Sequence, residues 1–226
     1  ALSPRLMNVM PGEDGYPATI EITLPAAMTV IPFGASEAEV VAEHGDGTKT
    51  WRYETNRAGG ILYAGDYVRE EIQAGGLTID FYYGRKHQAV MEAAGAAEAV
   101  LAVMDYCAGH YGSLAFGDGE RLKLIQSRVA GGGYAGDGAS LLDEADFTAH
   151  NLGDADKGGG AAEVMIHELV HQWWGLGNMF DTADPWSAEG LTCYTTYRIA
   201  KELYGEDYAR EHYVNQWRAE VEDYYL

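Results

Sequence analysis

The sequence is poor in basic side chains. Lys and Arg together number 15 against 35 Asp and Glu, which leaves a formal net charge of −20. A protein that binds nucleic acid must neutralise phosphates with Lys and Arg, so this balance argues against a nucleic-acid partner. It also disfavours docking on anionic lipid. We interpret the charge as a contribution to solubility.

Cysteine and long apolar runs are scarce as well. Cys107 and Cys193 cannot build a disulfide framework, and both lie in apolar or aromatic stretches, so we expect two buried free thiols. No apolar run approaches the roughly 20 residues that a spanning helix needs, so direct membrane insertion by this segment is not expected. The sequence also lacks an internal repeat and carries no signal for an oligomeric state.

A signal peptide is absent too. The chain opens abruptly with ALSPRLMNVM and stops inside a helical pattern, YAREHYVNQWRAEVEDYYL. We therefore expect a piece of a longer protein. A secreted or membrane-tethered parent would place this piece outside the cytoplasm.

What the sequence does contain begins with strands. With 226 residues, 47% of them hydrophobic, the chain can bury the core of one large or two small domains. Residues 18–25 alternate with Ile20, Ile22 and Leu24 on one face, and Pro25 ends that strand. Asp46-Gly47 predicts a hairpin turn, and residues 60–68 and 77–84 predict two more strands.

The hydrophobic period changes at about residue 86. A helical stripe runs through residues 87–112, with apolar positions at Val90, Ala94, Ala97, Leu101 and Met104. A strand at 121–127, a glycine-rich stretch and three helical patterns follow. The predicted class is α+β, with a β-rich segment at 1–85 and a second domain at 86–226.

The stretch VMIHELVHQWWG, residues 164–175, carries the strongest chemical signal. On a helix His167 and His171 lie about 40° apart, so both rings can bind one cation, and Glu168 lies at the edge of that face. Chance gives such a motif in about one chain in a hundred of this composition. The apolar neighbours predict a buried helix, where histidines and an acid need partners. We predict one Zn²⁺ ion, which normally takes three protein ligands in a catalytic site.

A third ligand is expected in the next helix. Pro185 is predicted at its first position with Asp184 as N-cap, and Glu189 about one turn inside. Glu202 falls among ordinary surface charges. Glu189 would be a poor solvent-facing residue because apolar or aromatic side chains flank it, namely Trp186, Leu191 and Tyr194.

HELVHQWWG followed by WSAEGLTCY resembles the gluzincin zinc aminopeptidases, the group of aminopeptidase N. The resemblance covers most of 86–226 and implies a thermolysin-like catalytic domain, truncated at its C-terminus, with 1–85 as part of an N-terminal β domain. It implies that His167, His171 and Glu189 bind zinc. It also implies that Glu168 activates a zinc-bound water and that the substrate is a peptide.

Three features depart from that family. Seventeen residues separate His171 from Glu189 where the family has eighteen, a difference that the intervening loop can absorb. The family holds the substrate's amine with a glutamate in a G-x-M-E-N stretch. Here we expect Gly133, Tyr134 and Ala135 to line the substrate, and alanine stands where that acid belongs. Asp137 or Glu144 are the nearest substitutes.

The third departure is the tyrosine that stabilises the developing oxyanion, expected beyond residue 226. Losing one such donor costs about a hundredfold in rate. The nearest tyrosines, Tyr213, Tyr224 and Tyr225, are expected to pack within helices. Three functions stay open: an aminopeptidase, a thermolysin-like endopeptidase, and a catalytically weak, zinc-stabilised peptide-binding module. The intact Glu168 argues against the last.

Two further patterns do not indicate a binding site of their own. Gly131, Gly133 and Gly136 match G-x-G-x-x-G, but the residues after them read as strand or loop, so we expect no dinucleotide site. These glycines instead suit close approach of a substrate backbone to an edge strand. Trp173 and Trp174 are expected to pack, and a carbonyl or carboxylate to fix each histidine tautomer. The remaining histidines show no ligand spacing: His44, His87, His110, His150 and His212.

Overall fold

The computed structural model describes most of the chain in separate ranges. They are 17–34, 36–55, 62–74, 76–114, 121–128, 132–136, 138–147, 163–176 and 185–225. Gly131, Asp137, His150 and Asp184, which the sequence analysis singled out, lie outside the described residues.

The first part of the chain is a three-stranded antiparallel sheet of order β1-β4-β3. Its strands are β1 (Ala18–Pro25), β3 (Glu39–Glu43) and β4 (Thr48–Thr55). The predicted alternation is confirmed, because every second residue of β1 is half-buried and the others are exposed. The predicted hairpin is confirmed too. Gly47 adopts φ 83° in the turn between β3 and β4, a conformation that favours glycine.

A small second sheet pairs β2 (Thr29–Pro32) with β5 (Leu62–Gly65). The prediction of one strand over 60–68 is wrong: β5 ends at Gly65, Asp66 forms a bend, and β6 (Tyr67–Ala74) runs on in a different sheet. The apolar pattern gave no sign of this change of sheet, since aromatic and β-branched residues continue across the bend.

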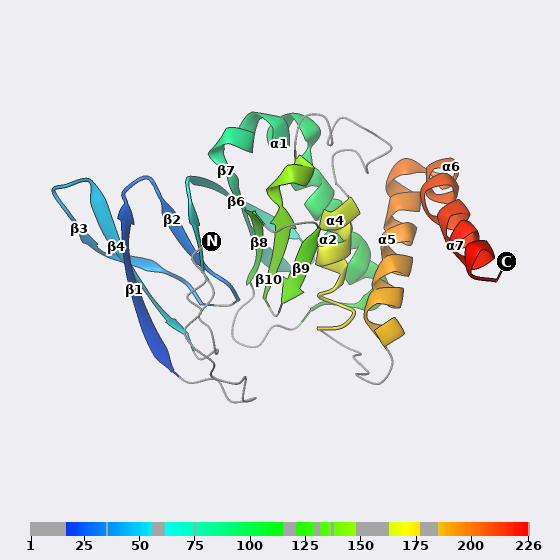
Figure 1. Cartoon of the computed structure of the whole chain (residues 1–226), viewed down its shortest axis with the longest axis horizontal. Coiled ribbons are helices and arrows are strands. Elements are labelled where there is room, and N and C mark those ends of the chain that lie inside the picture. Colours follow the sequence, from blue (N-terminus) through cyan, green and yellow to red (C-terminus); the bar gives the residue numbers. More distant parts are fainter. Residues whose placement is uncertain are drawn as a thin grey trace.

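The central sheet has five strands in the order β6-β7-β8-β10-β9 (Figure 1). β7 (Leu77–Gly84), β8 (Arg121–Ser127) and β10 (Ala139–Asp143) are parallel. The outer strands β6 and β9 (Gly133–Gly136) pair antiparallel to their neighbours. Thus β6 and β7, although they precede residue 86, belong to the sheet that carries the later helices, and β9 is its edge.

The two faces of this sheet are covered differently. Ile79, Phe81 and Leu124 contribute to a large core with α1 (Gln88–Ala94), α2 (Ala96–Tyr111) and α4 (Glu163–Val170). On the opposite face Tyr82 and Ile125 pack against Ile31 of β2, so the small β2–β5 sheet covers that side. A mixed α+β fold with a β-rich N-terminal part is therefore confirmed.

The single helix predicted over 87–112 is broken. A 3₁₀ turn, η1 (Arg85–His87), precedes α1, and Gly95 with φ 69° separates α1 from α2. The break rotates the second half of the predicted stripe, so Leu101 is 38% exposed while Val100 and Val103 are buried. Glycine permits the left-handed conformation that produces this shift.

Five helical elements of the described chain follow α4. A 3₁₀ turn, η5 (Pro185–Ser187), leads into α5 (Glu189–Tyr204). After it come α6 (Glu206–Ala209), the π-helical η6 (Arg210–Val214) and α7 (Asn215–Tyr225), which extends to one end of the molecule in Figure 1. Tyr213 is buried as predicted, but Tyr224 and Tyr225 are 83% and 79% exposed, so their predicted packing is wrong. Within the described part of the chain, no helix combines the length and apolar character needed to cross a membrane.

The two cysteines differ. Cys107 is buried on α2 as predicted, whereas Cys193 on α5 is exposed, so the prediction for Cys193 is wrong. The reason lies in how α5 packs. Its buried face is made largely by Thr192, Thr195 and Thr196, and Cys193 lies beside that face.

A buried lysine joins the first part of the chain to the central sheet. Lys123 of β8 is 2% exposed, and its ammonium donates to the carbonyl oxygens of Pro32 and Gly34 at 3.2 and 3.0 Å and also to that of Ser36. Glu37 adds an ion pair at 3.3 Å. Burial lowers the pKa of Lys123, and the nearby Glu37 opposes that shift. These partners satisfy a charge that would otherwise be costly to bury.

Candidate metal centre

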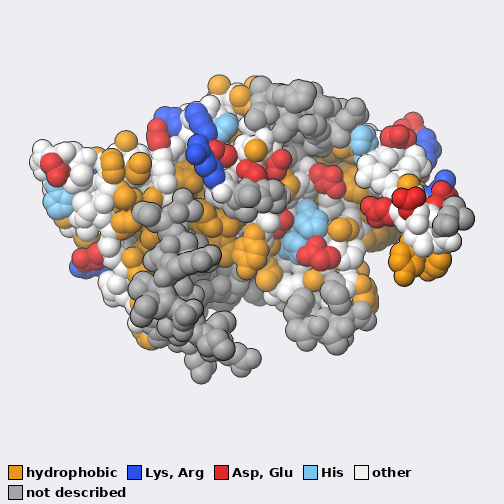
Figure 2. Space-filling view, viewed as in Figure 1, with side chains coloured by type: hydrophobic (Ala, Val, Ile, Leu, Met, Phe, Trp, Pro, Cys, Tyr) orange, Lys and Arg blue, Asp and Glu red, His pale blue; other side chains and the backbone are white. Residues whose placement is uncertain are grey.

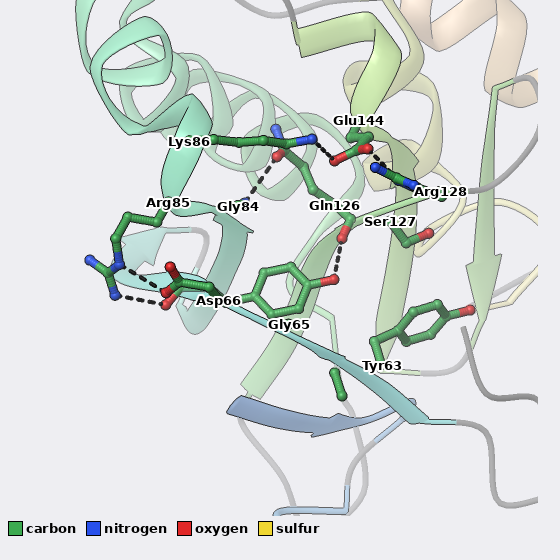
Figure 3. Close-up of a pocket in the computed structure, with 12 residues that line it drawn as sticks. Tyr63, Gly65, Asp66, Gly84, Arg85, Lys86, Gln126, Ser127, Arg128 and Glu144 are labelled. Carbon is green, nitrogen blue, oxygen red and sulfur yellow. Dashed lines mark hydrogen bonds and ion pairs between the residues drawn. The ribbon is translucent and has the colours of Figure 1, made fainter. Parts of the chain in front are cut away.

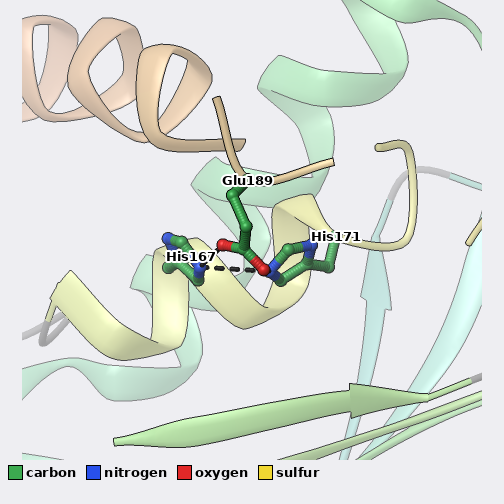
Figure 4. A group of neighbouring side chains, drawn as sticks. All are labelled: His167, His171 and Glu189. Carbon is green, nitrogen blue, oxygen red and sulfur yellow. Dashed lines mark hydrogen bonds and ion pairs between the residues drawn. The ribbon is translucent and has the colours of Figure 1, made fainter. Parts of the chain in front are cut away.

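Both histidines of the HELVH stretch come from one end of α4. His167 lies within the helix, and His171 follows its last residue while its amide still donates to the His167 carbonyl at 3.1 Å. The opposite side of this helix packs in the core through Ile166, Leu169 and Val170. The predicted buried helix is confirmed, and the two imidazole rings project from it together (Figure 4).

Glu189 reaches the same point from the next helix. It is the first residue of α5, preceded by the η5 turn, so the prediction that it lies one turn inside is wrong. The prediction that it avoids solvent is also wrong, because its side chain is 65% exposed. The neighbouring aromatic side chains do not cover Glu189 from solvent, since Trp186 is 57% exposed and Tyr194 is 48% exposed. Glu202, on the same helix, is exposed and lines a different cavity, as its assignment to the surface predicted.

The three side chains form a compact ligand set. The Nε2 atoms of His167 and His171 are 3.0 Å apart, and the Glu189 carboxylate lies 3.3 Å from the first and 3.5 Å from the second. Ligands bonded to zinc at about 2.0–2.1 Å in a tetrahedron are separated by about 3.3–3.4 Å. The separations are of the size needed for the three side chains to bind one ion, with one donor atom of each within 4.8 Å of the others. His167, His171 and Glu189 could therefore hold one metal ion.

No other metal-binding group of three or more His, Cys, Asp or Glu residues is found among the residues the structure describes. The described histidines that were predicted to be non-ligands, His44, His87, His110 and His212, are thus outside any such cluster.

The tautomer of His171 is fixed by its surroundings. Its Nδ1 lies 3.2 Å from the Trp174 carbonyl oxygen and 3.2 Å from Oγ1 of the buried Thr192. A proton on Nδ1 can be donated to that carbonyl, which leaves the lone pair of Nε2 for the metal. The sequence analysis expected a carbonyl or carboxylate in this role but did not find Thr192. A signal was available, because Thr192 lies three residues after Glu189 and so on the same face of α5.

Burial and charge set the acidity of His167 and Glu168. Burial lowers the pKa of His167, and the neighbouring His171 lowers it further, so the neutral ring that a metal requires is favoured. Glu168 is 6% exposed, and burial followed by the charge of Glu189 raises its pKa to about 7. A carboxyl group of that pKa is suited to exchange protons near neutral pH.

Gly133 on the edge strand makes room for Glu168. A Cβ atom at Gly133 would lie 2.3 Å from Cγ and 2.6 Å from Oε1 of Glu168. Any larger residue would displace the carboxylate. From the sequence, this glycine was predicted to allow a substrate backbone to approach the edge strand. The structure gives it a second and more direct reason.

Two buried polar side chains tie α4 to the edge of the sheet. Ser140 Oγ donates to the carbonyl oxygen of Glu168 at 3.0 Å, and Gln172 Nε2 donates to the Gly136 carbonyl and to Ser140 Oγ, both at 3.2 Å. Neither Ser140 nor Gln172 was predicted from the sequence to have this role. Their bonds fix the position of the helix that carries the histidines against β9 and β10.

The two tryptophans of this stretch pack, as predicted. Trp173 is 1% exposed and donates to the Gly112 carbonyl at 2.8 Å. Trp174 donates to Thr195 Oγ1 at 2.9 Å and meets the Tyr111 ring edge-on. The backbone carbonyl of Trp174 is also the partner of His171 Nδ1.

A cavity of about 610 Å³ opens over the metal-binding group. Its walls include His167, Glu168, His171 and Glu189. In Figure 2 histidine and acidic atoms meet on the face shown, where α4 lies in Figure 1. The three residues that the sequence analysis assigned to the substrate also line this cavity, namely Gly133, Tyr134 and Ala135.

Glu144, one of the two acids nearest in sequence to the missing amine anchor, lies elsewhere. It lines a separate cavity and pairs with Lys86 and Arg128. Among the described residues that line the metal-site cavity, Glu168 and Glu189 supply the only carboxylates. The G-x-G-x-x-G stretch leads from β9 into β10, a strand and not a helix, so its geometry is not that of a dinucleotide site.

Similarity to known proteins does not identify the site, so its interpretation depends on its geometry. No protein-family model matches the chain, and no curated protein matches it.

Proposed function

We propose that this chain is a zinc-dependent metallopeptidase with a thermolysin-like catalytic domain, hydrolysing peptide bonds in the manner of a gluzincin aminopeptidase. The observation that carries the proposal is the joint placement of two imidazoles, one carboxylate and one buried glutamate around a single cavity. The resemblance of HELVHQWWG and WSAEGLTCY to that family supports it.

The donor set supports zinc. His167 and His171 would supply two nitrogens and Glu189 one carboxylate oxygen, the three-ligand set typical of catalytic zinc sites. A structural site would normally close all four positions with protein ligands. The buried Glu168, which is outside the ligand set, would also be unnecessary there. These points favour catalysis over a purely structural metal.

The chemistry divides between the ion and the chain. When bound, zinc supplies Lewis acidity, which lowers the pKa of water from near 16 toward about 7 and polarises a carbonyl group. Glu168 accepts a proton from the water that adds to the scissile carbonyl carbon. It then returns that proton to the amide nitrogen as the C–N bond breaks. Trp174 and Thr192 hold His171 in the required tautomer throughout.

The described cavity lining favours a second candidate of the same class. An aminopeptidase must pair the substrate's ammonium, because an unpaired charge in a closed pocket is costly. Ala135 supplies no carboxylate, and the two described acids of this cavity are committed to the metal and to catalysis. A thermolysin-like endopeptidase, which needs no such anchor, is therefore the alternative.

Two substitutions test the roles. Glu168→Gln should retain zinc and lose turnover by a factor of about 10² to 10⁴, whereas His167→Ala should lose the ion. Zinc content by elemental analysis and hydrolysis of a peptide reporter measure the two effects. Equal loss of zinc in both variants would contradict the assignment of Glu168 as the base. Normal turnover of Glu168→Gln would contradict the peptidase mechanism itself.

Substrate blocking separates the two peptidase types. We expect an aminopeptidase to cleave aminoacyl reporters and to leave N-acetylated peptides intact. Cleavage of both at similar kcat/KM would replace the aminopeptidase assignment with the endopeptidase.

A further inference from the structure

A second cavity, of about 430 Å³, lies at the carboxyl ends of the parallel strands. Gly84 ends β7, Ser127 ends β8, and Glu144 directly follows β10. Parallel sheets commonly bind ligands beyond the carboxyl ends of their strands. This cavity shares no lining residue with the metal-site cavity, so a ligand there is separate from the proposed peptidase chemistry.

Basic side chains gather at this cavity although the chain is strongly acidic. Arg85, Lys86 and Arg128 line it against two carboxylates, Asp66 and Glu144 (Figure 3). Basic atoms also cluster on the face shown in Figure 2, above the end of β7 in the view of Figure 1. The local balance is therefore positive in a protein whose formal net charge is −20.

The cations of this cavity have donors that their ion pairs do not use. Lys86 Nζ lies 2.9 Å from Glu144 Oε2, and Arg128 Nε lies 2.8 Å from Oε1. The Nε2 atom of His87 is also 3.6 Å from Oε2. Within the described residues, Arg128 uses only Nε in this contact, and its side chain is 83% exposed. Its two terminal NH₂ groups remain available to a ligand.

A buried hydroxyl adds to this surplus. Ser127 is 7% exposed and lines the cavity, and its Oγ has no hydrogen-bond partner among the described residues. Buried polar atoms are normally paired, so this hydroxyl is a donor that a ligand in the cavity can engage once the side chain turns toward it. Tyr67 and Gln126 beside it are already joined, since the Tyr67 hydroxyl donates to the Gln126 carbonyl at 2.8 Å.

The geometry points to a binding site for a small phosphate-bearing molecule, held by Lys86, Arg128 and Ser127. An acceptor-rich anion fits a cavity with surplus donors. A single carboxylate does not exhaust these donors, as the contacts of Glu144 demonstrate. Phosphate offers more acceptor oxygens at higher charge, and arginine is well suited to bind it. The ring of Tyr63 in the same wall can contact the organic part of the ligand.

Glu144 then acts as a competitor for the same two cations. Binding requires the phosphate to share or replace its contacts with Lys86 and Arg128. Removing the charge of Glu144 should therefore strengthen phosphate binding, while removing the cations should weaken it. A merely structural ion-pair cluster predicts neither response.

The test is a titration of the full chain, stripped of metal so that phosphate cannot bind at a zinc ion. Inorganic phosphate is the probe, followed by calorimetry, with acetate at the same ionic strength as comparison. We expect saturable phosphate binding that acetate does not reproduce. Lys86→Gln with Arg128→Gln should weaken it by about tenfold or more, and Ser127→Ala by about threefold. Glu144→Gln should tighten it several-fold.

A matched variant guards against a general charge effect. Lys201→Gln with Arg210→Gln removes the same charge from ion pairs on the C-terminal helices and should leave phosphate affinity unchanged. An equal loss in this control would overturn the site, as would acetate binding of similar strength or the absence of saturable binding. Should the double variant unfold, the opposite responses of Ser127→Ala and Glu144→Gln still decide. None of these outcomes depends on peptidase activity.

Discussion

The two halves of the metal centre are built in opposite ways. His167 and His171 belong to a helix packed in the core, and their side chains are 24% and 12% exposed. Glu189 begins a helix at the rim of the cavity and is 65% exposed. The imidazoles thus come from a packed part of the structure and the carboxylate from an exposed one. A preorganised ligand contributes more to affinity because less ordering entropy is lost on binding.

The sharpest test of this contrast is to remove a ligand from each half. His171→Ala should lower zinc affinity on the order of a thousandfold, since one of three bonds and its fixed geometry are lost. Glu189→Gln should lower affinity less, because water can take the place of an exposed carboxylate. Competition with a chelator of known affinity measures both. A larger loss of zinc affinity in Glu189→Gln than in His171→Ala would contradict the proposed difference between the two halves of the site.

Gly133→Ala should disturb the buried side selectively. The new Cβ would lie 2.3 Å from Glu168 Cγ, so the carboxylate that we propose as the base must move. A shift of about 1 Å in a reacting group costs about a hundredfold in kcat, while the metal ligands are untouched. Gly109→Ala is the control, because no atom lies within 4 Å of its added Cβ. Full activity of Gly133→Ala would show that Glu168 does not act from this position.

The pH dependence of stability should separate a buried carboxylate from an exposed one. Burial, with the charge of Glu189, raises the pKa of Glu168 to about 7, above the unfolded value of 4.5. Its favourable contribution is thus complete below about pH 4.5 and is lost as pH rises through 7. In the metal-free protein, Glu168→Gln should raise the free energy of unfolding at pH 8 by about 2 to 3 kcal/mol, and less toward pH 5.

The matched comparison for this measurement is Glu189→Gln. Because Glu189 is 65% exposed, its neutralisation should change the unfolding free energy little at any pH. Denaturant titrations of both variants at pH 5 and pH 8 provide the values. A stabilisation that does not grow with pH would contradict the assignment of the shift to burial.

The smallest expected effect concerns the hydroxyl that joins the two helices. Thr192→Val removes the contact with His171 Nδ1 and keeps the side-chain volume, so zinc affinity should fall by about tenfold. Thr195→Val, which removes the partner of Trp174 Nε1 instead, is the control and should affect zinc less. Equal affinities for the wild type and Thr192→Val would leave the Trp174 carbonyl as the sole support of the tautomer.

The sequence predicted the histidine half of the site well and the carboxylate half less well. Helix α4 has a strong signal, since apolar residues surround two histidines at the spacing of one turn. Helix α5 buries a face rich in threonine, so hydrophobic periodicity did not show which side is covered. For that reason the predicted burial of Glu189 and Cys193 was wrong, although Glu189 joins the metal-binding group as predicted.

Other parts of the fold depend on contacts that no local pattern records. The turn at Gly95 and the change of sheet at Asp66 each alter a predicted element at a single residue. The second cavity assembles residues from three strand ends that are far apart in the sequence. Only the order of strands in the sheet brings them together, and that order could not be read from periodicity.

The buried ammonium of Lys123 limits where the protein can be truncated. Its three carbonyl partners lie between residues 32 and 36, whereas the lysine itself stands in the middle of the central sheet. Removing the leading strands to isolate the helical half would leave the Lys123 ammonium buried in the core without its three carbonyl partners. The natural place to cut this polypeptide is therefore not the point where strands give way to helices.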